Sequence, residues 1–199
     1  SIVQKIIENN LTLFRAFANG YNWIKNKYYD IEYKNLGYYS NIQTDMANYF
    51  RSVMIDWLLN KNNREDIENN LEKSFLMDYT KNIVPKGTKG HGKFLDSVIL
   101  EFINKINKDI TTITNGIIEY YVLSKNYSIP IIVFNDVSRI LYIFDNGIVY
   151  DENINNSKDI DTKFAKYKQI ETLKNAINIK FTINQAYGIP QDIQIIDYK

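Results

Sequence analysis

Few side chains in this sequence could carry chemistry of their own. The chain has no cysteine and a single histidine, His91. This histidine stands between two glycines in the run P-K-G-T-K-G-H-G-K at residues 85–93, which predicts a mobile basic loop. A phosphate-binding loop needs a preceding strand and ends in G-K-[S/T], whereas this run follows a predicted helix and ends in G-K-F. We therefore interpret His91 as a mobile surface residue rather than as a catalytic base.

Acidic side chains offer a second kind of chemistry, the binding of a divalent cation. Asp145, Asp151 and Glu152 lie at the ends of predicted strands and could come together. Acidic residues at strand ends usually face water, and we favour this interpretation. The sequence contains no zinc-binding Cys/His pattern, no H-E-x-x-H and no G-x-S-x-G. We therefore predict no metal ion and no cofactor.

Composition limits the classes of partner. Lysine plus arginine number 24 and aspartate plus glutamate 23, so a net charge of +1 gives no attraction to nucleic acid or anionic lipid. Aromatic residues make up 14% of the chain, but they recur at helical spacing and favour a core over a base-stacking surface. No long apolar run and no signal peptide is present, so we expect neither a membrane span nor export. The lack of cysteine favours a reducing, intracellular compartment.

Helices are predicted for the first half of the chain. Apolar residues recur at helical spacing in five stretches, residues 2–7, 12–24, 41–60, 64–83 and 94–106. Thr12 is a suitable N-cap for the second stretch, because its hydroxyl can accept a hydrogen bond from a free backbone N–H. The third stretch carries the most regular apolar stripe and predicts a helix that faces the core.

Strands are predicted for the second half. An amphipathic segment at residues 116–125 leads into short β-branched and aromatic runs at residues 131–134, 140–144, 148–150, 177–183 and 193–198. Asn146-Gly147 predicts a hairpin, since both residues accept a positive φ. Helices followed by a mostly antiparallel sheet indicate an α+β domain, with the N-terminal helices packed around the sheet. We expect a single domain over residues 1–199, taken from a longer protein because the sequence starts at Ser1.

Three blocks of the sequence resemble the ovarian tumour (OTU) family of cysteine deubiquitinases. N-G-I-I-E-Y-Y-V-L-S at residues 115–124, followed by P-I-I-V-F at 130–134, is similar to the family's W-G-G-x-x-E-L-x-A-L-[A/S] helix and P-I-x-V-[Y/F] strand. N-N-L-T-L-F-R-A at residues 9–16 resembles D-G-N-C-L-F-R-A, the start of the family's catalytic helix. Residues 49–58 are similar to its L-R-x-x-[I/V]-V-D-[Y/F]-[L/I] helix. The order of the blocks is that of the family, so the resemblance implies an OTU-like fold.

The resemblance also implies a catalytic site without its catalytic groups. Thr12 takes the position of the nucleophilic cysteine and Asn9 that of an aspartate. Ala186 takes the position of the histidine base, and Gly188 that of the acid that orients it. In the family, a cysteine acts as nucleophile at this position because the helix start and a neighbouring histidine lower its pKa. A threonine hydroxyl would need a strong base beside it. We therefore expect a pseudo-deubiquitinase that has lost catalysis.

Such a domain would act as a protein-interaction module. The implied partner is ubiquitin, a ubiquitin-like protein or another chain of a larger viral or parasite assembly in a host cytoplasm. An AT-rich genome would account for the abundance of asparagine, isoleucine, lysine and tyrosine. A bound tail would lie between the helix start at Thr12 and the turn at residues 184–188, and the implied contacts are Leu13, Gly116, Glu119, Tyr187 and His91, the last on a loop that closes over the tail.

Two alternatives stay open. The first is an active OTU-type isopeptidase that carries inactivating substitutions here, or whose nucleophile lies elsewhere. The second is a coincidental resemblance, in which case the chain is an unrelated α+β structural or interaction domain. Turnover of a ubiquitin substrate would support the first alternative, and a lack of any ubiquitin binding would support the second.

Overall fold

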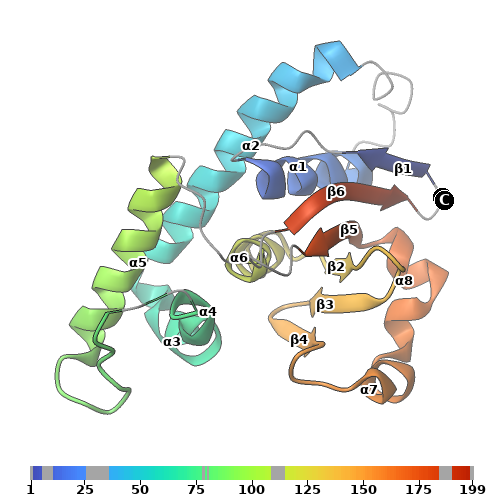
Figure 1. Cartoon of the computed structure of the whole chain (residues 1–199). Helices are drawn as coiled ribbons and strands as arrows, with labels where there is room; N and C mark the ends of the chain where they lie inside the picture. Colours follow the sequence, from blue (N-terminus) through green and yellow to red (C-terminus); the bar gives the residue numbers. More distant parts are fainter. Residues whose placement is uncertain are drawn as a thin grey trace.

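Helices make up most of the described first half of the chain, and five of the six strands described lie in the second half. A computed structural model describes residues 2–5, 11–25, 36–77, 79, 81–108, 115–183 and 190–197. The helices are α1 (Thr12–Lys25), α2 (Leu36–Leu59), η3 (Lys61–Asn63), α3 (Arg64–Asn70), α4 (Glu72–Phe75), α5 (His91–Asn107), α6 (Ile117–Tyr127), α7 (Ser157–Thr162), η4 (Ala165–Lys168) and α8 (Ile170–Lys174). The strands are β1 (Ile2–Lys5), β2 (Ile131–Phe134), β3 (Ile140–Phe144), β4 (Ile148–Asp151), β5 (Ile177–Ile183) and β6 (Pro190–Asp197) (Figure 1). The fold is therefore α+β, as predicted.

The strands form one mixed sheet in the order β1-β6-β5-β2-β3-β4. Neighbouring strands are antiparallel except β2 and β5, which run parallel with Ile131 opposite Ile177. A parallel pair cannot be closed by a tight turn and needs a crossover. Here the crossover consists of β3, β4 and the three short helical segments α7, η4 and α8.

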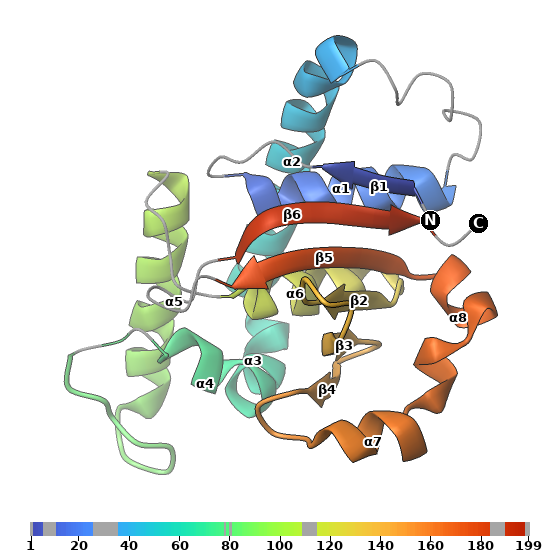
Figure 2. The same ribbon diagram turned by 45° about the vertical axis from the view of Figure 1, so that its right-hand side comes forward.

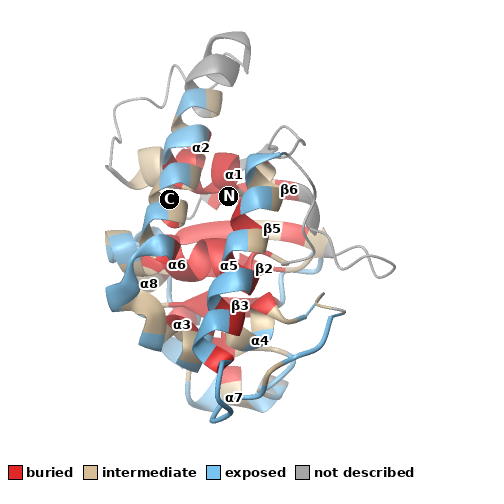
Figure 3. Ribbon diagram, turned by 90° about the vertical axis from the view of Figure 1, so that its left-hand side faces the viewer, coloured by how far each residue is buried: buried red, intermediate tan, exposed pale blue. Residues whose placement is uncertain are grey.

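Successive residues of the central strands face opposite sides of the sheet. Ile131 and Val133 of β2 pack into a core with side chains of α1, α2, α5 and α6. Ile132 and Phe134 face the other way and pack with side chains of α7, η4 and α8. Each β2 residue is buried, because helical segments cover both faces of the sheet at its centre. Figure 3 shows this distribution, with buried residues on the central strands and exposed ones along the outer side of α5.

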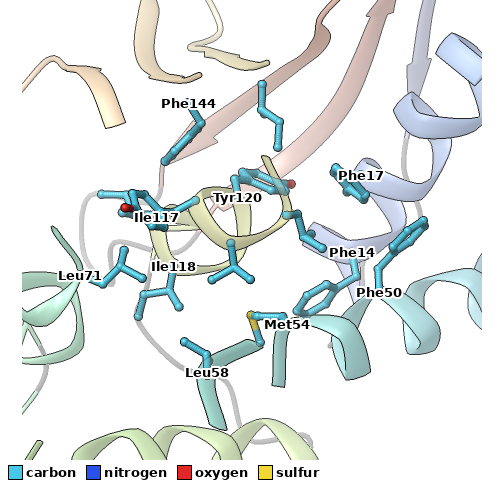
Figure 4. Packing of buried hydrophobic residues seen from close by; sticks show 14 of the residues in the cluster. Phe14, Phe17, Phe50, Met54, Leu58, Leu71, Ile117, Ile118, Tyr120 and Phe144 are labelled. Atoms are coloured by element: carbon cyan, nitrogen blue, oxygen red, sulfur yellow. The ribbon is translucent and has the colours of Figure 1, made fainter. Parts of the chain in front are cut away.

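The larger core fixes the positions of α1 and α6. Phe14 and Phe17 of α1 pack with Phe50 and Met54 of α2 and with Tyr120 of α6, and all five side chains are buried (Figure 4). The rings of Phe17 and Phe50 meet edge to face at 4.8 Å. Burying large apolar side chains removes their surface from water and gives the main stabilisation of such a core. The first turns of α1 and α6 are thereby held in defined places.

The predicted hairpin is confirmed. Asn146 and Gly147 connect β3 to β4 with φ of 55° and 133°. The Asp145 N–H donates to the Gly147 carbonyl at 2.9 Å and closes the turn. A positive φ suits asparagine and glycine better than other residues, which is why the dipeptide identified the turn from sequence.

The prediction of a helix at residues 2–7 is wrong. Residues 2–5 form β1, which pairs with β6 so that Ile2 lies opposite Asp197. Apolar residues in so short a run fit either a helix or a strand. Pairing with a strand nearly two hundred positions away decides the outcome, and no local pattern reveals it.

Helix boundaries differ from the predictions in three places. The predicted helix at residues 64–83 is two short helices, α3 and α4, separated at Leu71 (φ −120°), and helical structure ends after Phe75. Helix α2 begins at Leu36 rather than at residue 41, and α5 begins at His91 rather than at residue 94. None of the helices described is long and apolar enough to cross a membrane.

Candidate functional site

Helix α1 begins at the predicted nucleophile position. Thr12 is its first residue, and the Leu11 carbonyl accepts a hydrogen bond from the Arg15 N–H at 2.8 Å. Leu11 therefore holds the N-cap position, and the expectation that Thr12 caps the helix is wrong by one residue. The Thr12 side chain is half-buried. Backbone N–H groups of a first helical turn favour an anionic partner such as a carboxylate.

The first turn of α6 packs directly on that of α1. The Tyr120 hydroxyl donates to the Leu13 carbonyl at 3.0 Å. Gly116, which precedes α6, has a φ of 85°, and a Cβ built on it would lie 3.5 Å from Leu13 Cδ2. Glycine accepts this backbone conformation without strain and leaves room for Leu13. Two predicted contact residues, Leu13 and Gly116, are thus neighbours in space although about a hundred positions separate them.

Glu119 is part of the interior rather than of a surface. Its side chain is 2% exposed. Burial, and secondarily the charge of Glu119, raise the pKa of Tyr120 well above its usual value. The expectation that Glu119 contacts a partner directly is therefore wrong for this structure, because its side chain is buried on α6.

Strand β5 packs against α1 and leads towards the residues that follow position 183. Ile177, at the start of β5, lies against Gly20 in the second half of α1. From there β5 runs back along the helix, so that its last residues and the first residues of β6 lie at the same end of the sheet as the start of α1 (Figures 1 and 2). The connection between β5 and β6 carries Ala186 and Tyr187, which lie outside the described residues, as does Asn9.

His91 lies apart from the start of α1 and from the last residues of β5. It is the first residue of α5 and is 7% exposed. Its Nε2 lies 2.6 Å from Glu72 Oε1, and its Nδ1 lies 2.6 Å from the Val84 carbonyl oxygen. The prediction of a mobile surface histidine is therefore wrong, because α4 and the segment before α5 enclose the ring. The loop before α5 lies beside α3 and α4, away from the start of α1 in both views (Figures 1 and 2).

The acidic residues considered for a cation have separate partners. Asp145 accepts a hydrogen bond from the Tyr167 hydroxyl at 2.7 Å, and Asp151 accepts one from the Asn153 N–H at 2.8 Å. Glu152 forms an ion pair with Arg139 at 2.9 Å. Among the residues that the structure describes, no group of three His, Asp or Glu side chains is placed to hold a metal ion.

A cavity of about 470 Å³ lies on the opposite face of the sheet, between β2–β4 and the segments α7, η4 and α8. Phe134, Ile140 and Tyr150 line it together with Arg139 and Lys168. Its cations already have anionic partners, because Arg139 pairs with Glu152 and Lys168 with Asp161. The cavity therefore offers no excess charge that would select a ligand.

Sequence reasoning missed two residues that hold α1 against its neighbouring helices. Tyr120 links the helices through its hydroxyl, as described above. Arg15 is 5% exposed and donates to Thr44 Oγ1 of α2 at 2.6 Å, which joins α1 to α2. The signal for Tyr120 was available, since a tyrosine inside an apolar helix needs a partner for its hydroxyl.

The chain is similar to a giant-virus protein. It is 31% identical over 196 residues to an uncharacterized protein of Acanthamoeba polyphaga mimivirus. The matched region covers 98% of this chain but 11% of that protein, so the relative is a much longer polypeptide with a counterpart of nearly the entire domain. No protein-family model and no solved structure matches the chain.

Proposed function

We propose that this chain is an OTU-like domain that has lost its catalytic groups and binds another protein, with ubiquitin or a ubiquitin-like protein as the first partner to test. One observation supports this most. The first turns of α1 and α6 are in contact, and β5 ends at the same end of the sheet. A groove between Thr12 and the β5–β6 connection requires this arrangement.

The chemistry of the chain supports binding rather than catalysis. Acyl transfer by a threonine hydroxyl needs a base close to it, most often an imidazole. The only imidazole in the chain belongs to His91, which is enclosed between α4 and the segment before α5. The start of a helix such as α1 carries a partial positive charge, which favours a carboxylate such as the end of a peptide tail.

Substitution of Thr12 tests the binding proposal. Thr12→Arg places a long side chain at the start of α1, where its bulk would obstruct a bound tail. We expect ubiquitin to bind the unmodified chain and to bind this variant roughly tenfold more weakly or worse. Titration of the labelled chain with ubiquitin, followed by NMR, measures both affinities.

Thr162→Arg is the matched control. Thr162 is exposed on α7, and the same change there should leave both binding and thermal stability unaltered. Equal affinities for the Thr12→Arg and Thr162→Arg variants would contradict the proposed groove. Absence of any ubiquitin binding by the unmodified chain would contradict the proposal and support a coincidental resemblance.

Turnover of a fluorogenic ubiquitin ester tests the loss of catalysis. We expect the unmodified chain to release fluorophore at the uncatalysed rate, because no base accompanies Thr12. A Thr12→Cys, Ala186→His variant restores the cysteine and the histidine and would gain measurable turnover if the two positions share a site. Turnover by the unmodified chain that disappears in Thr12→Ala would instead show an active enzyme.

A further inference from the structure

A groove of about 460 Å³ lies on the outer side of α5. Its lining includes Leu100, Glu101 and Lys105 of α5, together with Lys81 from the segment before this helix and Lys108 just after it. Figure 3 shows this side of α5, along which exposed residues follow one another. No described residue of α1 or α6 lines the groove, so it is separate from the candidate site.

Positive charge predominates in this groove. Glu101 is the one carboxylate among the described residues that line it, and its Oε1 lies 3.6 Å from Lys81 Nζ and 3.9 Å from Lys105 Nζ. Lys108 is exposed and forms no ion pair with any residue that the structure describes. Three lysines against one carboxylate leave an excess of two positive charges. The chain as a whole has a net charge of only +1, so this excess is a local feature.

The end of α5 offsets part of this charge but not all of it. The last turn of a helix carries a partial charge equivalent to roughly −0.5, which favours lysines such as Lys105 there. Another cation already serves this helix end, because Arg51 of α2 donates to the Ile106 carbonyl at 3.4 Å. The helix end therefore accounts for some of the lysine charge, and the remainder is available to an anionic partner.

Leu100 gives the groove an apolar point between polar side chains. It is 50% exposed, and Ser97 and Asn104 line the groove one turn before it and one turn after it. A single exposed leucine is common on protein surfaces and indicates nothing alone. Here it shares a concave surface with three lysines. A partner that covers this surface must therefore bring an apolar side chain together with negative charges.

We propose that this groove binds an acidic segment of a partner polypeptide. An aliphatic side chain of the segment packs on Leu100, and its carboxylates pair with Lys81, Lys105 and Lys108. Lysine suits such a partner, because its compact charge on a flexible stem can follow carboxylates without a fixed geometry. A nucleic acid suits the groove less well, since its described lining contains no aromatic side chain on which a base would stack. Exposed ion pairs are weak one by one, so the binding is weak and depends on salt.

Fluorescence anisotropy with labelled peptides tests the proposal on the unmodified chain. The first peptide carries a leucine flanked by glutamates on both sides. A second replaces the glutamates with glutamines, and a third replaces the leucine with alanine. We expect the second to bind about tenfold more weakly than the first or worse, and the third about threefold more weakly. No binding of the first peptide, equal binding of either control peptide, or tighter binding of a single-stranded oligonucleotide would overturn the proposal.

A matched pair of double variants locates the binding surface. Lys105→Glu with Lys108→Glu reverses two charges of the groove, and Lys174→Glu with Lys158→Glu changes the net charge equally on α8 and α7. Lys105 and Lys174 each form an ion pair with a glutamate of their own helix, so the two variants lose similar contacts.

We expect the affinity for the first peptide to fall about tenfold or more in the groove variant and to stay within about twofold in the control variant. Equal losses in the two variants would show a general attraction of charges and would overturn the proposal. Thermal denaturation checks that both variants fold. If the groove variant fails to fold, the peptide comparison on the unmodified chain still decides.

Discussion

Gly20 sets how closely α1 approaches the sheet. A Cβ built on this residue would collide with Ile177 Cγ2 and lie 3.1 Å from Cγ1 of the same side chain. Ile177 is 1% exposed and packs in the larger core, so it cannot move aside easily. The absence of a side chain at one position therefore allows α1 to lie against the first residue of β5.

Gly20→Ala should destabilise the domain although alanine is the better helix former. Alanine gains about 1 kcal/mol of helix propensity over glycine, whereas overpacking of a core costs about 1–3 kcal/mol or more in tight sites. We expect a net loss of roughly 1–2 kcal/mol in the free energy of unfolding, measured by urea denaturation.

Gly92→Ala provides the matched control. Gly92 is also helical, but a Cβ there would meet nothing within 4 Å. This variant should gain up to about 1 kcal/mol, because only the propensity term applies. Equal effects of the two substitutions would contradict the close approach of α1 and β5.

At the scale of elements, Asp66 ties α3 to α6. Its carboxylate accepts hydrogen bonds from the Tyr121 hydroxyl and from Lys125 Nζ, both at 2.5 Å. Asn70 of the same helix donates a third at 2.8 Å. Burial alone would raise the pKa of Asp66, but the bonds from Lys125, Tyr121 and Asn70 outweigh it, and the pKa lies below its usual value. The contact therefore stabilises the ionised form.

This lowered pKa predicts how stability depends on pH. A carboxyl whose pKa is lower in the folded state contributes stability above its unfolded pKa, about 3.9 for aspartate, and loses it as the pH falls further. Asp66→Asn should cost roughly 1–2 kcal/mol at neutral pH and should lose less additional stability than the unmodified chain below about pH 4. Denaturation at a series of pH values measures both effects.

Asp56→Asn tests whether the effect belongs to this contact. Asp56 is exposed on α2, and its substitution should change stability little at any pH. Parallel pH profiles for the unmodified chain and for Asp66→Asn would contradict the assignment of a lowered pKa to Asp66.

At the scale of the whole molecule, local patterns predicted the elements better than their arrangement. The β-branched runs and Asn146-Gly147 identified β2, β3 and their hairpin partner because strand propensity and turn chemistry depend on neighbouring residues. The strand at residues 2–5 was not predicted from the sequence, because only its pairing with β6 makes it a strand. The parallel pairing of β2 with β5 was hidden for the same reason, since a crossover of more than forty residues separates them.

In the candidate site too, some features followed from local sequence and others depended on how distant elements pack. The aligned motifs named Leu13 and Gly116, and the structure places these two residues side by side. The burial of Glu119 and of His91 could not be foreseen, since it depends on elements that pack from elsewhere in the chain. His91 shows this most clearly, because a glycine-rich context suggests exposure whereas α4 encloses the ring.

The pairing of β1 with β6 also determines how the domain would respond to force. Ile2 and Asp197 are opposite each other, so both ends of the fold emerge at one corner of the sheet (Figure 2). Tension applied to the two ends pulls across the strands rather than along them. The pairs from Ile2–Asp197 to Lys5–Gln194 would then open one after another, like a zipper, instead of sharing the load. A longer polypeptide under tension would therefore peel β1 away first and leave the remaining strands and their helices intact.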